Sequence, residues 1–524
     1  MIRNFQPEDL PQVMNIWLEE NMKAHNFINS QHWEENYAFV QGIIPQAEVY
    51  VILNENIVAG FIGIDNGFIA GIFVKEAFQG KGLGRKLIEK AKSEYTRLSL
   101  HVYKKNLQAL VFYKRLGFFA ESERIEEANG EEEYVMVWEK NKLVILEEPF
   151  VSSETIEYLK NENVKVLKNN KTEEIIDSSG IQFVSEAEFL SLYNQQGIIY
   201  TNSENALSWI INNIDDKELL ATIDNVKDKN KFREILKPLD PDFFYKEVSL
   251  ENLENINPRE LPLPLILKPS VGFFSVGVYT IESSEDWDKA VTEIKAQHKE
   301  WKNTYSESVV SDGMFILEQY ITGDEYAIDA YFDNKGNPVI LNIMKHEFSG
   351  SKDVSDRLYY SGYQVIKHNL ENFTNYLNEI NKYLKAKNFP VHIEIRVEKG
   401  KIMAIECNPM RFAGWCTTDL TLFAYGFRTY DYYLNNIVPA WDSLLKGKED
   451  ILYGMVVLDK SGEINKNTSF DYEGIEKCFD KVLKIRKLDY KKYPVFGFVF
   501  TETKVNNKGE LDRMMTEDLK KYLR

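Results

Sequence analysis

Three oxygen-bearing side chains near one turn are the residues of this chain best suited to chemistry. The stretch Pro390–Phe412 holds two short apolar runs, VHIEIRV and KIMAIEC, on either side of a Glu-Lys-Gly-Lys turn, which predicts a β-hairpin. Glu406 and Asn408 are two residues apart on the second run and therefore point to one face, with Glu394 in neighbouring register on the first. Two carboxylates and an amide oxygen suit Mg²⁺ rather than zinc. The alternative is a half-exposed hairpin with solvated acids.

The phrase IECNPMR and the spacing of these three residues resemble the catalytic end of the ATP-grasp ligases. Two earlier segments strengthen the resemblance. The segment from Asp228 to Arg233 is similar to the DKxxxR entry of that family, which implies that Lys229 reaches the nucleotide phosphates. The segment LPLPLILKPSVGFFSVGVYTI places Lys268 on a strand before a loop with Gly272, and such a lysine and glycine loop implies a clamp over ATP.

A further segment, MFILEQYITGDEYAIDAYF, carries two acids on either side of a Thr-Gly turn. The resemblance implies that Glu318 and the backbone after it, from Gln319 through Tyr320 to Ile321, lie beside adenine. It implies that Glu325 accepts hydrogen bonds from the ribose hydroxyls, which need an acceptor such as a carboxylate.

The chain departs from the family pattern at two positions. The family often has an arginine two residues after the ligand asparagine, where this chain has Met410, so the contact with a carboxylate or acyl phosphate is assigned to Arg411. D-alanine ligase relatives have an arginine two residues before the first metal acid, where this chain has His392. The resemblance implies that a substrate carboxylate attacks the γ-phosphate of ATP and that an amine displaces the resulting acyl phosphate.

Two other segments of this half could contact substrate. Lys345, His346 and Arg357 flank a polar run rich in Ser, Asp and Gly, and they could hold a substrate carboxylate or belong to a solvated loop. The run FAGWCTTDLTLFAYGF is aromatic and either lines an acceptor pocket or packs in a core.

A glycine-rich turn near the N-terminus predicts a second site. The segment GFIAGIFV is followed by FQGKGLGRKLIEKAKSEY, which reads as a strand, a turn and an amphipathic helix. Backbone N–H groups at such a helix start favour phosphate oxygens, and glycine lets the ligand approach the backbone. The pattern Gln79-x-x-Gly82-x-Gly84 resembles the pyrophosphate motif of GNAT N-acyltransferases. The acetyl-CoA residues that this resemblance implies are Val74, Gln79, Gly80, Gly82, Leu83, Gly84, Arg85 and Asn106.

The segment LSLHVYKKNLQALVFYKRLGF resembles the second half of the GNAT fold. Its position makes Tyr113 the candidate general acid, because a phenol can donate a proton to the CoA thiolate. The alternative for Tyr113 is core packing. His25 and Glu76 are both candidates for the general base.

Composition limits the partners. The chain has 524 residues and a net charge of -18, which argues against nucleic acid or an anionic membrane as a main partner. The start lacks a signal-peptide pattern and the three cysteines are few, so we expect a cytoplasmic protein. We expect Cys407 to be a small buried side chain, since it points away from its neighbours Glu406 and Asn408.

Length and alternating patterns predict a multidomain chain of α/β and α+β folds. We expect a GNAT domain over 1–140, an α/β domain preceding the ATP-grasp fold over 141–225, and an ATP-grasp domain over 226–445 with a lid at about 240–320. Residues 446–524 read as a C-terminal α+β appendage.

The two resemblances together predict a bifunctional enzyme that uses ATP, Mg²⁺ and acetyl-CoA. It would N-acetylate an amino acid or small peptide and join a carboxylate to a second amine, in either order. Two alternatives stay open: a ligase that forms a thioester or ester, and a GNAT module that only senses acyl-CoA. The sequence leaves the assembly open, with a homodimer as one option.

Overall fold

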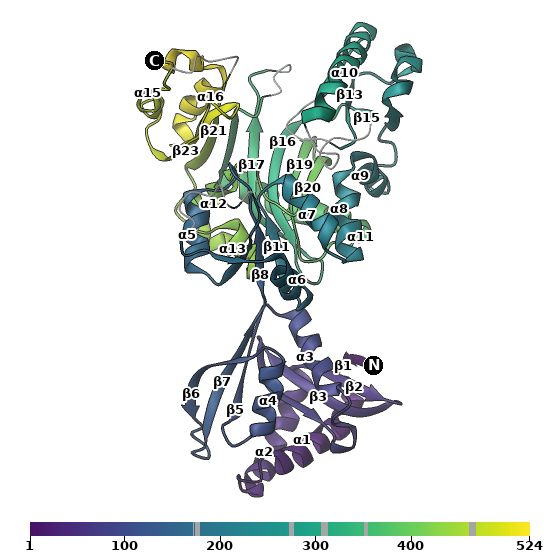
Figure 1. Ribbon diagram of the computed structural model, residues 1–524, viewed down its shortest axis with the longest axis vertical. Coiled ribbons are helices and arrows are strands. Elements are labelled where there is room, and N and C mark those ends of the chain that lie inside the picture. Colours follow the sequence, from purple (N-terminus) through teal and green to yellow (C-terminus); the bar gives the residue numbers. More distant parts are fainter. Residues whose placement is uncertain (171, 173–178, 272–276, 305–312, 351–354, 461–467) are drawn as a thin grey trace. The chain divides into compact units, whose positions relative to one another are not determined.

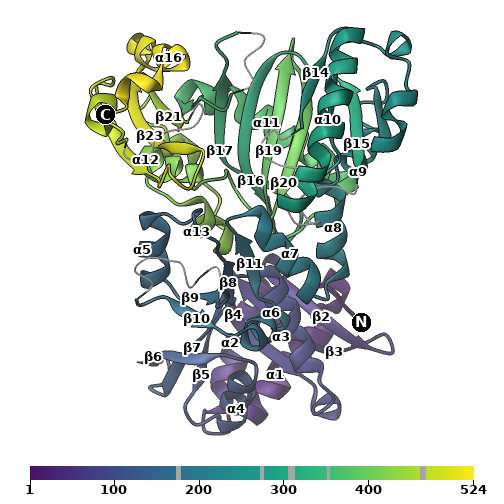
Figure 2. The ribbon, with the colours of Figure 1, turned by 45° about the horizontal axis from the view of Figure 1, so that its top comes forward.

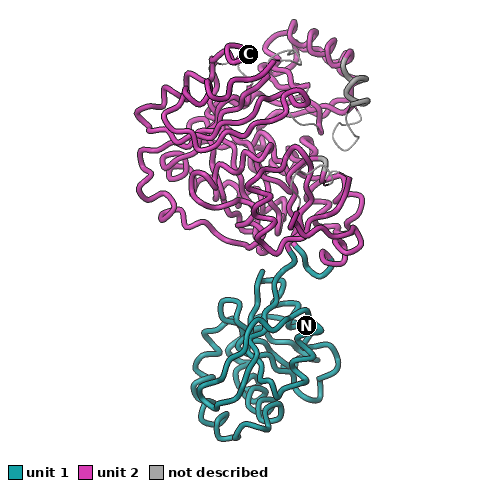
Figure 3. Tube along the Cα trace, turned by 60° about the vertical axis from the view of Figure 1, so that its left-hand side comes forward, with its two compact units in different colours: residues 1–141, 194–197 teal, residues 142–193, 198–524 magenta. Residues whose placement is uncertain are grey.

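A computed structural model describes this chain except for residues 171, 173–178, 272–276, 305–312, 351–354 and 461–467. The described residues fall into two compact units, Met1–Asn141 with Asn194–Gly197, and Lys142–Tyr193 with Ile198–Arg524 (Figure 3). None of the helices in the described ranges is long and apolar enough to cross a membrane.

Unit 1 is built on a seven-stranded sheet in the order β1-β2-β3-β4-β5-β7-β6. Its strands are β1 (Ile2–Asn4), β2 (Glu48–Asn54), β3 (Ile57–Asp65), β4 (Phe68–Val74), β5 (Arg97–Tyr103), β6 (Phe119–Ile125) and β7 (Glu132–Glu139). Its helices are α1 (Leu10–Ala24), α2 (Ser30–Ile43), α3 (Leu83–Glu94) and α4 (Leu107–Arg115).

Both faces of this sheet are covered, because its strands alternate apolar residues toward two cores. On β2, Val49 and Val51 join a core with α1 and Trp33 of α2, whereas Tyr50 and Ile52 join a core with α3 and α4.

Strands β4 and β5 diverge in the middle of the sheet. Their pairing is parallel and has one register pair, Phe68 with Ser99. Beyond it, β4 pairs with β3 and β5 pairs with β7, and Figure 1 shows β5–β7 turning away from β2 and β3. The divergence leaves the end of β4 beside the start of α3.

Unit 2 begins with a parallel four-stranded sheet in the order β10-β9-β8-β11. Its elements are β8 (Lys142–Ile145), α5 (Ser153–Asn161), β9 (Val164–Leu167), β10 (Gln182–Val184), α6 (Glu186–Asn194), β11 (Ile198–Thr201), α7 (Glu204–Asn213), α8 (Lys217–Lys227) and α9 (Lys229–Leu236). The N-terminal cap of α5 is Ser152, whose side chain accepts from the N–H of Thr155.

A second, antiparallel sheet follows in the order β12-β15-β13-β14. Its elements are β12 (Tyr245–Ser249), β13 (Leu265–Pro269), β14 (Tyr279–Ile281), α10 (Ser284–Thr304) and β15 (Met314–Gln319). This sheet has its own core, in which Leu265, Leu267 and Phe315 pack with Trp287 and Ile294 of α10. A separate core is what a segment needs in order to move as a body.

An eight-stranded antiparallel sheet forms the rest of unit 2, in the order β20-β19-β16-β17-β18-β21-β23-β22 (Figures 1 and 2). Its strands are β16 (Asp324–Phe332), β17 (Pro338–Glu347), β18 (Leu358–Gly362), β19 (Phe389–Glu398), β20 (Lys401–Pro409), β21 (Ile451–Asp459), β22 (Val482–Lys487) and β23 (Val495–Lys504). Its helices are α11 (Tyr363–Leu384), α12 (Leu420–Tyr425), α13 (Thr429–Leu434), α14 (Trp441–Leu444), α15 (Tyr472–Glu476) and α16 (Gly509–Thr516).

The C-terminal segment differs from the appendage that the sequence suggests. Strand β21 pairs with β18 along Leu358–Gly362, and β23 and β22 continue the same sheet. Local pattern shows that these strands exist, but the pairing with β18 spans about ninety residues of sequence and is fixed only by the tertiary fold. Strands β21, β22 and β23 therefore belong to the central sheet.

Candidate functional site

The predicted hairpin carries the three candidate oxygen ligands on neighbouring positions. Strands β19 and β20 pair with Glu394 directly opposite Glu406, and His392 opposite Asn408. The Asn408 amide donates to Glu406 Oε1 at 3.3 Å. All three ligand candidates are partly exposed.

The electrostatics of this cluster favour a cation. Burial raises the pKa of Glu394, and the Glu406 carboxylate raises it further. Burial also acts to raise the pKa of Glu406, but the charges of Lys229 and Lys268 outweigh it and lower that pKa to about 2. Lys229 Nζ lies 3.4 Å from Glu406 Oε2. Two facing carboxylates with an amide oxygen form a donor set that fits Mg²⁺.

A buried ion cluster connects this hairpin with the smaller antiparallel sheet. Glu318 at the end of β15 accepts from Arg233 Nε and pairs with Lys268 Nζ, each at 2.6 Å. Burial opposes ionisation, but the two cations hold the pKa of Glu318 at about 2. Arg233 also donates to the carbonyl of Ala404 on β20, at 2.6 Å. Arg233 thus joins α9, β15 and β20.

Glu325, the predicted ribose acceptor, lies at the start of β16 and already has two partners. Its Oε1 is 2.7 Å from His346 Nδ1, and its Oε2 accepts from Arg396 Nε at 2.9 Å. The His346 ring stacks on Tyr359 at 4.0 Å. His346, a candidate contact for a substrate carboxylate, is therefore in contact with Glu325 in this structure.

The backbone between β15 and β16 is partly occupied as well. The N–H groups of Gln319 and Tyr320 donate to the carbonyls of Phe244 and Pro264, at 2.9 and 3.2 Å. The carbonyl of Ile321 accepts from Arg396. Gly272, in the predicted loop after Lys268, lies outside the described residues.

Arg411 and the two other candidate substrate cations all pair within the protein. Arg411 Nε donates to Glu204 Oε1 at 2.8 Å, which ties the segment after β20 to the start of α7. Lys345 pairs with Asp324 at 3.2 Å. Arg357 pairs with Asp459 at 2.5 Å and also donates to the carbonyls of Met514 and Glu517.

In unit 1, the predicted glycine turn precedes α3. Gly80 and Gly82 have φ values of 73° and 77°, a conformation that favours glycine, and α3 starts at Leu83. Gly84 and Arg85 follow in the first turn of α3. Backbone N–H groups in the first turn of a helix have no partner within the helix, and phosphate groups bind to such N–H groups.

Gln79 is held by protein groups. Its side-chain amide donates to the carbonyl of Val74 at 2.8 Å and to Glu20 Oε2 at 3.0 Å. Glu20 on α1 is 7% exposed and also accepts from the N–H of Glu76, at 3.2 Å. Glu20 therefore stabilises the turn through hydrogen bonds, a role that the sequence analysis did not predict. The only indication in the sequence was an acidic residue among the apolar residues of this helix.

Asn106 and His25, two of the residues predicted for unit 1, lie together at the start of α4. Asn106 caps this helix through the N–H of Ala109, and its amide lies 3.3 Å from His25 Nε2. Burial lowers the pKa of His25 to about 4. Glu76 is exposed and pairs with Lys23 at 3.0 Å.

Tyr113, the predicted general acid, is 7% exposed and packs edge-on against Phe112 and Phe118. Burial raises the pKa of its phenol, so the hydroxyl keeps its proton at neutral pH.

Comparison with known proteins separates the two halves. A family model of the acetyltransferase (GNAT) domain matches residues 45–119. Peptidyl-lysine N-acetyltransferase YiaC of Escherichia coli (strain K12) is 32% identical over 120 residues, which are 22% of this chain and 82% of that protein. Through its N-terminal unit, this chain belongs to the GNAT acetyltransferases. Peptidyl-lysine N-acetyltransferase YjaB of the same organism is 30% identical over 118 residues, which are 22% of this chain and 80% of that protein.

An ATP-grasp domain model matches residues 261–419. The crystal structure of an L-amino acid ligase from Bacillus licheniformis aligns with a TM-score of 0.54 at 19% identity, covering 74% of this chain and 99% of that one. At 19% identity, this likeness shows that the two chains share a fold and nothing more. The chain is therefore an enzyme that joins a GNAT acetyltransferase domain to an ATP-grasp domain, and the predicted fold class is confirmed.

The ATP-grasp half contains a buried aspartate that sequence reasoning missed. Asp329 on β16 is 0% exposed and accepts from the N–H of Ala413 at 2.8 Å and from Thr418 Oγ1 at 2.7 Å. It also lies 2.8 Å from Nδ1 of His392, whose Nε2 is 3.7 Å from Glu394. Asp329 thus fixes the segment after β20 to the strand that carries the first ligand candidate.

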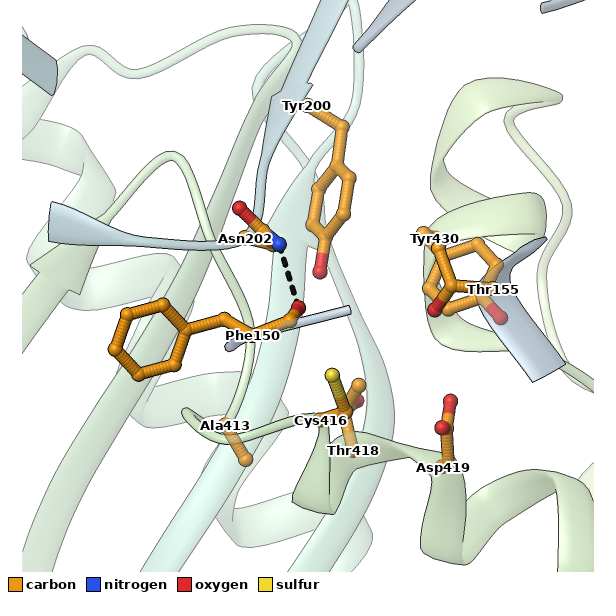
Figure 4. A pocket seen from close by; sticks show the side chains of 9 residues that line it. All are labelled: Phe150, Thr155, Tyr200, Asn202, Ala413, Cys416, Thr418, Asp419 and Tyr430. Carbon is orange, nitrogen blue, oxygen red and sulfur yellow. Dashed lines mark hydrogen bonds between the residues drawn. The ribbon is translucent and has the colours of Figure 1, made fainter. Parts of the chain in front are cut away.

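A small pocket, the Asp419 pocket, lies where loops of the parallel sheet meet the segment after β20 (Figure 4). Its walls are Phe150, Thr155, Tyr200, Asn202, Ala413, Cys416, Thr418, Asp419 and Tyr430. Four of these residues come from the aromatic run that the sequence offers as either a pocket lining or a core. Neighbours in that run, Leu420 and Tyr425, are core residues, so the run does both.

Proposed function

We propose that the ATP-grasp half is a carboxylate-amine ligase that forms an amide through an acyl phosphate and releases ADP and phosphate. The observation that carries this proposal is the register of β19 and β20, which sets Glu394 against Glu406 beside Asn408, with Lys229 Nζ 3.4 Å from Glu406. The same proposal assigns ATP phosphates to Lys229 and Lys268, and adenine and ribose to the Glu318–Glu325 segment.

In this reaction a carboxylate oxygen bonds to the γ-phosphorus while the bond to the β-phosphate oxygen breaks, and ADP leaves. The amine nitrogen then bonds to the acyl carbon, the bond to the phosphate oxygen breaks, and the amine loses a proton. Mg²⁺ held by Glu394, Glu406 and Asn408 would offset phosphate charge. Lys229 and Lys268 supply positive charge from the protein side.

The ion pairs in the structure have a role in this scheme. Arg233 and Lys268 keep Glu318 ionised in a buried position, and Arg396 does the same for Glu325. Lys268 pairs with Glu318 in this structure, so binding of the ATP phosphates by Lys268 would weaken or break that ion pair. Arg411 would turn from Glu204 toward the acyl phosphate.

For the GNAT half we propose acetyl transfer from acetyl-CoA to an amine, with the first turn of α3 on the pyrophosphate and Tyr113 as proton donor to the thiolate. The His25 ring lies 3.3 Å from the Asn106 amide and burial lowers its pKa to about 4, so it is neutral at neutral pH, as a general base must be before it takes a proton. The acceptor is proposed to be the amino acid or small peptide that the ligase half also uses. A peptidyl-lysine acceptor is a second candidate, favoured by the similarity to two peptidyl-lysine N-acetyltransferases of E. coli.

The two halves can be tested in one screen. Phosphate release would be measured across pairs of amino acids with and without acetyl-CoA, followed by mass analysis of the products. A product that is both an amide of two amino acids and acetylated supports the coupled enzyme. An amide without acetylation, together with acetylated lysine in an added peptide, would support the second acceptor. ADP release that needs a thiol or an alcohol would indicate a thioester or ester ligase, whereas acetyl-CoA binding with no acetyl product would indicate a sensor.

A further inference from the structure

The Asp419 pocket contains a buried carboxylate oxygen for which the described residues supply no hydrogen-bond donor. Asp419 is 1% exposed; its Oδ2 accepts from Arg486 at 2.6 Å, but its Oδ1 has no hydrogen-bond partner within the described part of the chain. The Ser152 hydroxyl is a further partner of the Asp419 carboxyl, and the Thr155 hydroxyl is a partner of Tyr430, which is 3% exposed. Buried polar atoms are normally satisfied, so an unpartnered carboxylate oxygen in a pocket indicates a missing donor.

The cations around this pocket cannot supply that donor without losing other contacts. Arg486 donates to the carbonyls of Trp415 and Cys416, at 3.0 and 2.7 Å, as well as to Asp419 Oδ2. Lys484 pairs with Glu154 at 2.6 Å, and Glu154 lies 3.6 Å from Arg486. Each nearby cation therefore has its carboxylate, and the second oxygen of Asp419 is left facing the pocket.

The remaining walls suit a small positive group. The rings of Tyr200 and Tyr430 border the space, and aromatic faces attract cations. Figure 4 shows the Tyr200 hydroxyl, the Cys416 sulfur and the Asp419 carboxylate directed into it. A primary ammonium group has three donors and one positive charge in a compact form, which matches one carboxylate oxygen and hydroxyl groups at small volume.

The pocket is also coupled to the proposed ATP site. Its wall residues Ala413 and Thr418 both donate to Asp329, which contacts His392 two residues before Glu394. A molecule held in the pocket therefore lies against the segment that leads from the proposed metal ligands through Arg411.

We propose that the Asp419 pocket binds the primary ammonium group of the amino acid whose carboxylate is activated by ATP. This inference rests on the ligase function proposed above and names the class of its carboxylate substrate as a free amino acid. An N-acetylated amino acid has no charge at that nitrogen and adds an acetyl group, so the pocket would reject it. If one molecule passes through both halves, ligation precedes acetylation.

The test is ADP release with the best free amino acid from the screen, its N-acetyl form and its 2-hydroxy-acid analogue, each with the same acceptor amine. The free amino acid should have a kcat/KM at least about 100-fold above both analogues. Asp419→Asn should raise the KM for this amino acid at least about 10-fold with the KM for ATP unchanged. Tyr430→Phe, which keeps the ring and its packing, should raise it a few-fold. Asp442→Asn is the matched control, because Asp442 is an exposed aspartate paired with Lys367 and neither residue lines the pocket.

Use of the N-acetyl or 2-hydroxy form at the rate of the free amino acid would overturn the inference and leave the ligase function in place. So would an unchanged KM in both Asp419→Asn and Tyr430→Phe. If Asp419→Asn fails to fold because Arg486 loses its partner, Tyr430→Phe and the two analogues still decide. No ADP release with any acid, while acetyl transfer persists, would refute the ligase function itself and the inference with it.

Discussion

Glu394 lies directly opposite Glu406 across the β19–β20 hairpin, so two carboxylates meet at one position of the sheet. Like charges in this relation destabilise a sheet unless something positive lies between them. The protein supplies Lys229 at 3.4 Å from Glu406, and the members of the cluster are partly exposed. Substitution of a residue in this carboxylate pair should therefore reduce the use of ATP and leave acetyl transfer unchanged.

Substitution of Glu406 by glutamine should abolish ATP use alone. We expect Glu406→Gln to lower ADP formation by at least about 100-fold, because the proposed metal loses a charged ligand, while acetyl transfer stays unchanged. The measurement is coupled ADP release next to acetyl-CoA consumption on the same preparation. Glu398→Gln, an exposed acid on the same hairpin, should leave both rates alone. Loss of both activities in Glu406→Gln would contradict separate sites.

Removal of the Glu318 charge should destabilise unit 2. Glu318→Gln leaves Arg233 and Lys268 buried without their carboxylate, and breaking such a pair costs about 3–5 kcal/mol. Urea unfolding followed by tryptophan fluorescence would measure this loss. As a control, Asp442→Asn breaks an exposed pair with Lys367 and should cost under about 1 kcal/mol. Equal effects of the two substitutions would show that the buried cluster is not structural.

His25 should make unit 1 sensitive to acid. Its pKa in the fold is about 4, below the ordinary value of 6.5, so the unfolded chain binds the proton first as pH falls. The stability that neutral His25 contributes is complete above about pH 6.5 and is lost between about pH 6.5 and 4, by at most about 3 kcal/mol. As the pH falls through that range, the free energy of unfolding of the His25→Gln protein should therefore decrease less steeply than that of the wild-type protein. His368→Gln, at an exposed position of α11, should keep the wild-type slope.

A side chain in the glycine turn before α3 should lower both the stability of unit 1 and its affinity for acetyl-CoA. Gly82 has φ 77°, so Gly82→Ala should cost about 1–2 kcal/mol of stability. A Cβ there meets no protein atom within 4 Å, so a weaker affinity for acetyl-CoA would come from the methyl group facing the ligand. Gly42→Ala is the matched control, since Gly42 lies in α2 with open space around it and should gain stability. Calorimetric titration with acetyl-CoA would compare the two, and an unchanged affinity in Gly82→Ala would place the pyrophosphate elsewhere.

The sequence determined the elements that carry chemistry through short-range patterns. Alternating apolar residues around Glu-Lys-Gly-Lys gave the hairpin, and its two-residue period placed Glu406 and Asn408 on one face before any fold was known. Glycines at Gly80 and Gly82 likewise gave the turn and the start of α3, because their conformation is local.

Only the tertiary structure decided which distant groups become partners. The contacts of Asp329 with His392 and Thr418, of Glu20 with Gln79, and of Asp419 with Arg486 join residues 59 to 89 positions apart. The pairing of β21 with β18 also joins distant segments, and it places β21 in the central sheet, whereas the sequence suggested an appendage over residues 446–524. The periodicity of apolar residues determines on which face of a strand or helix a side chain lies. Which residue contacts that side chain depends on how segments far apart in the sequence pack together, and a local pattern does not contain that information.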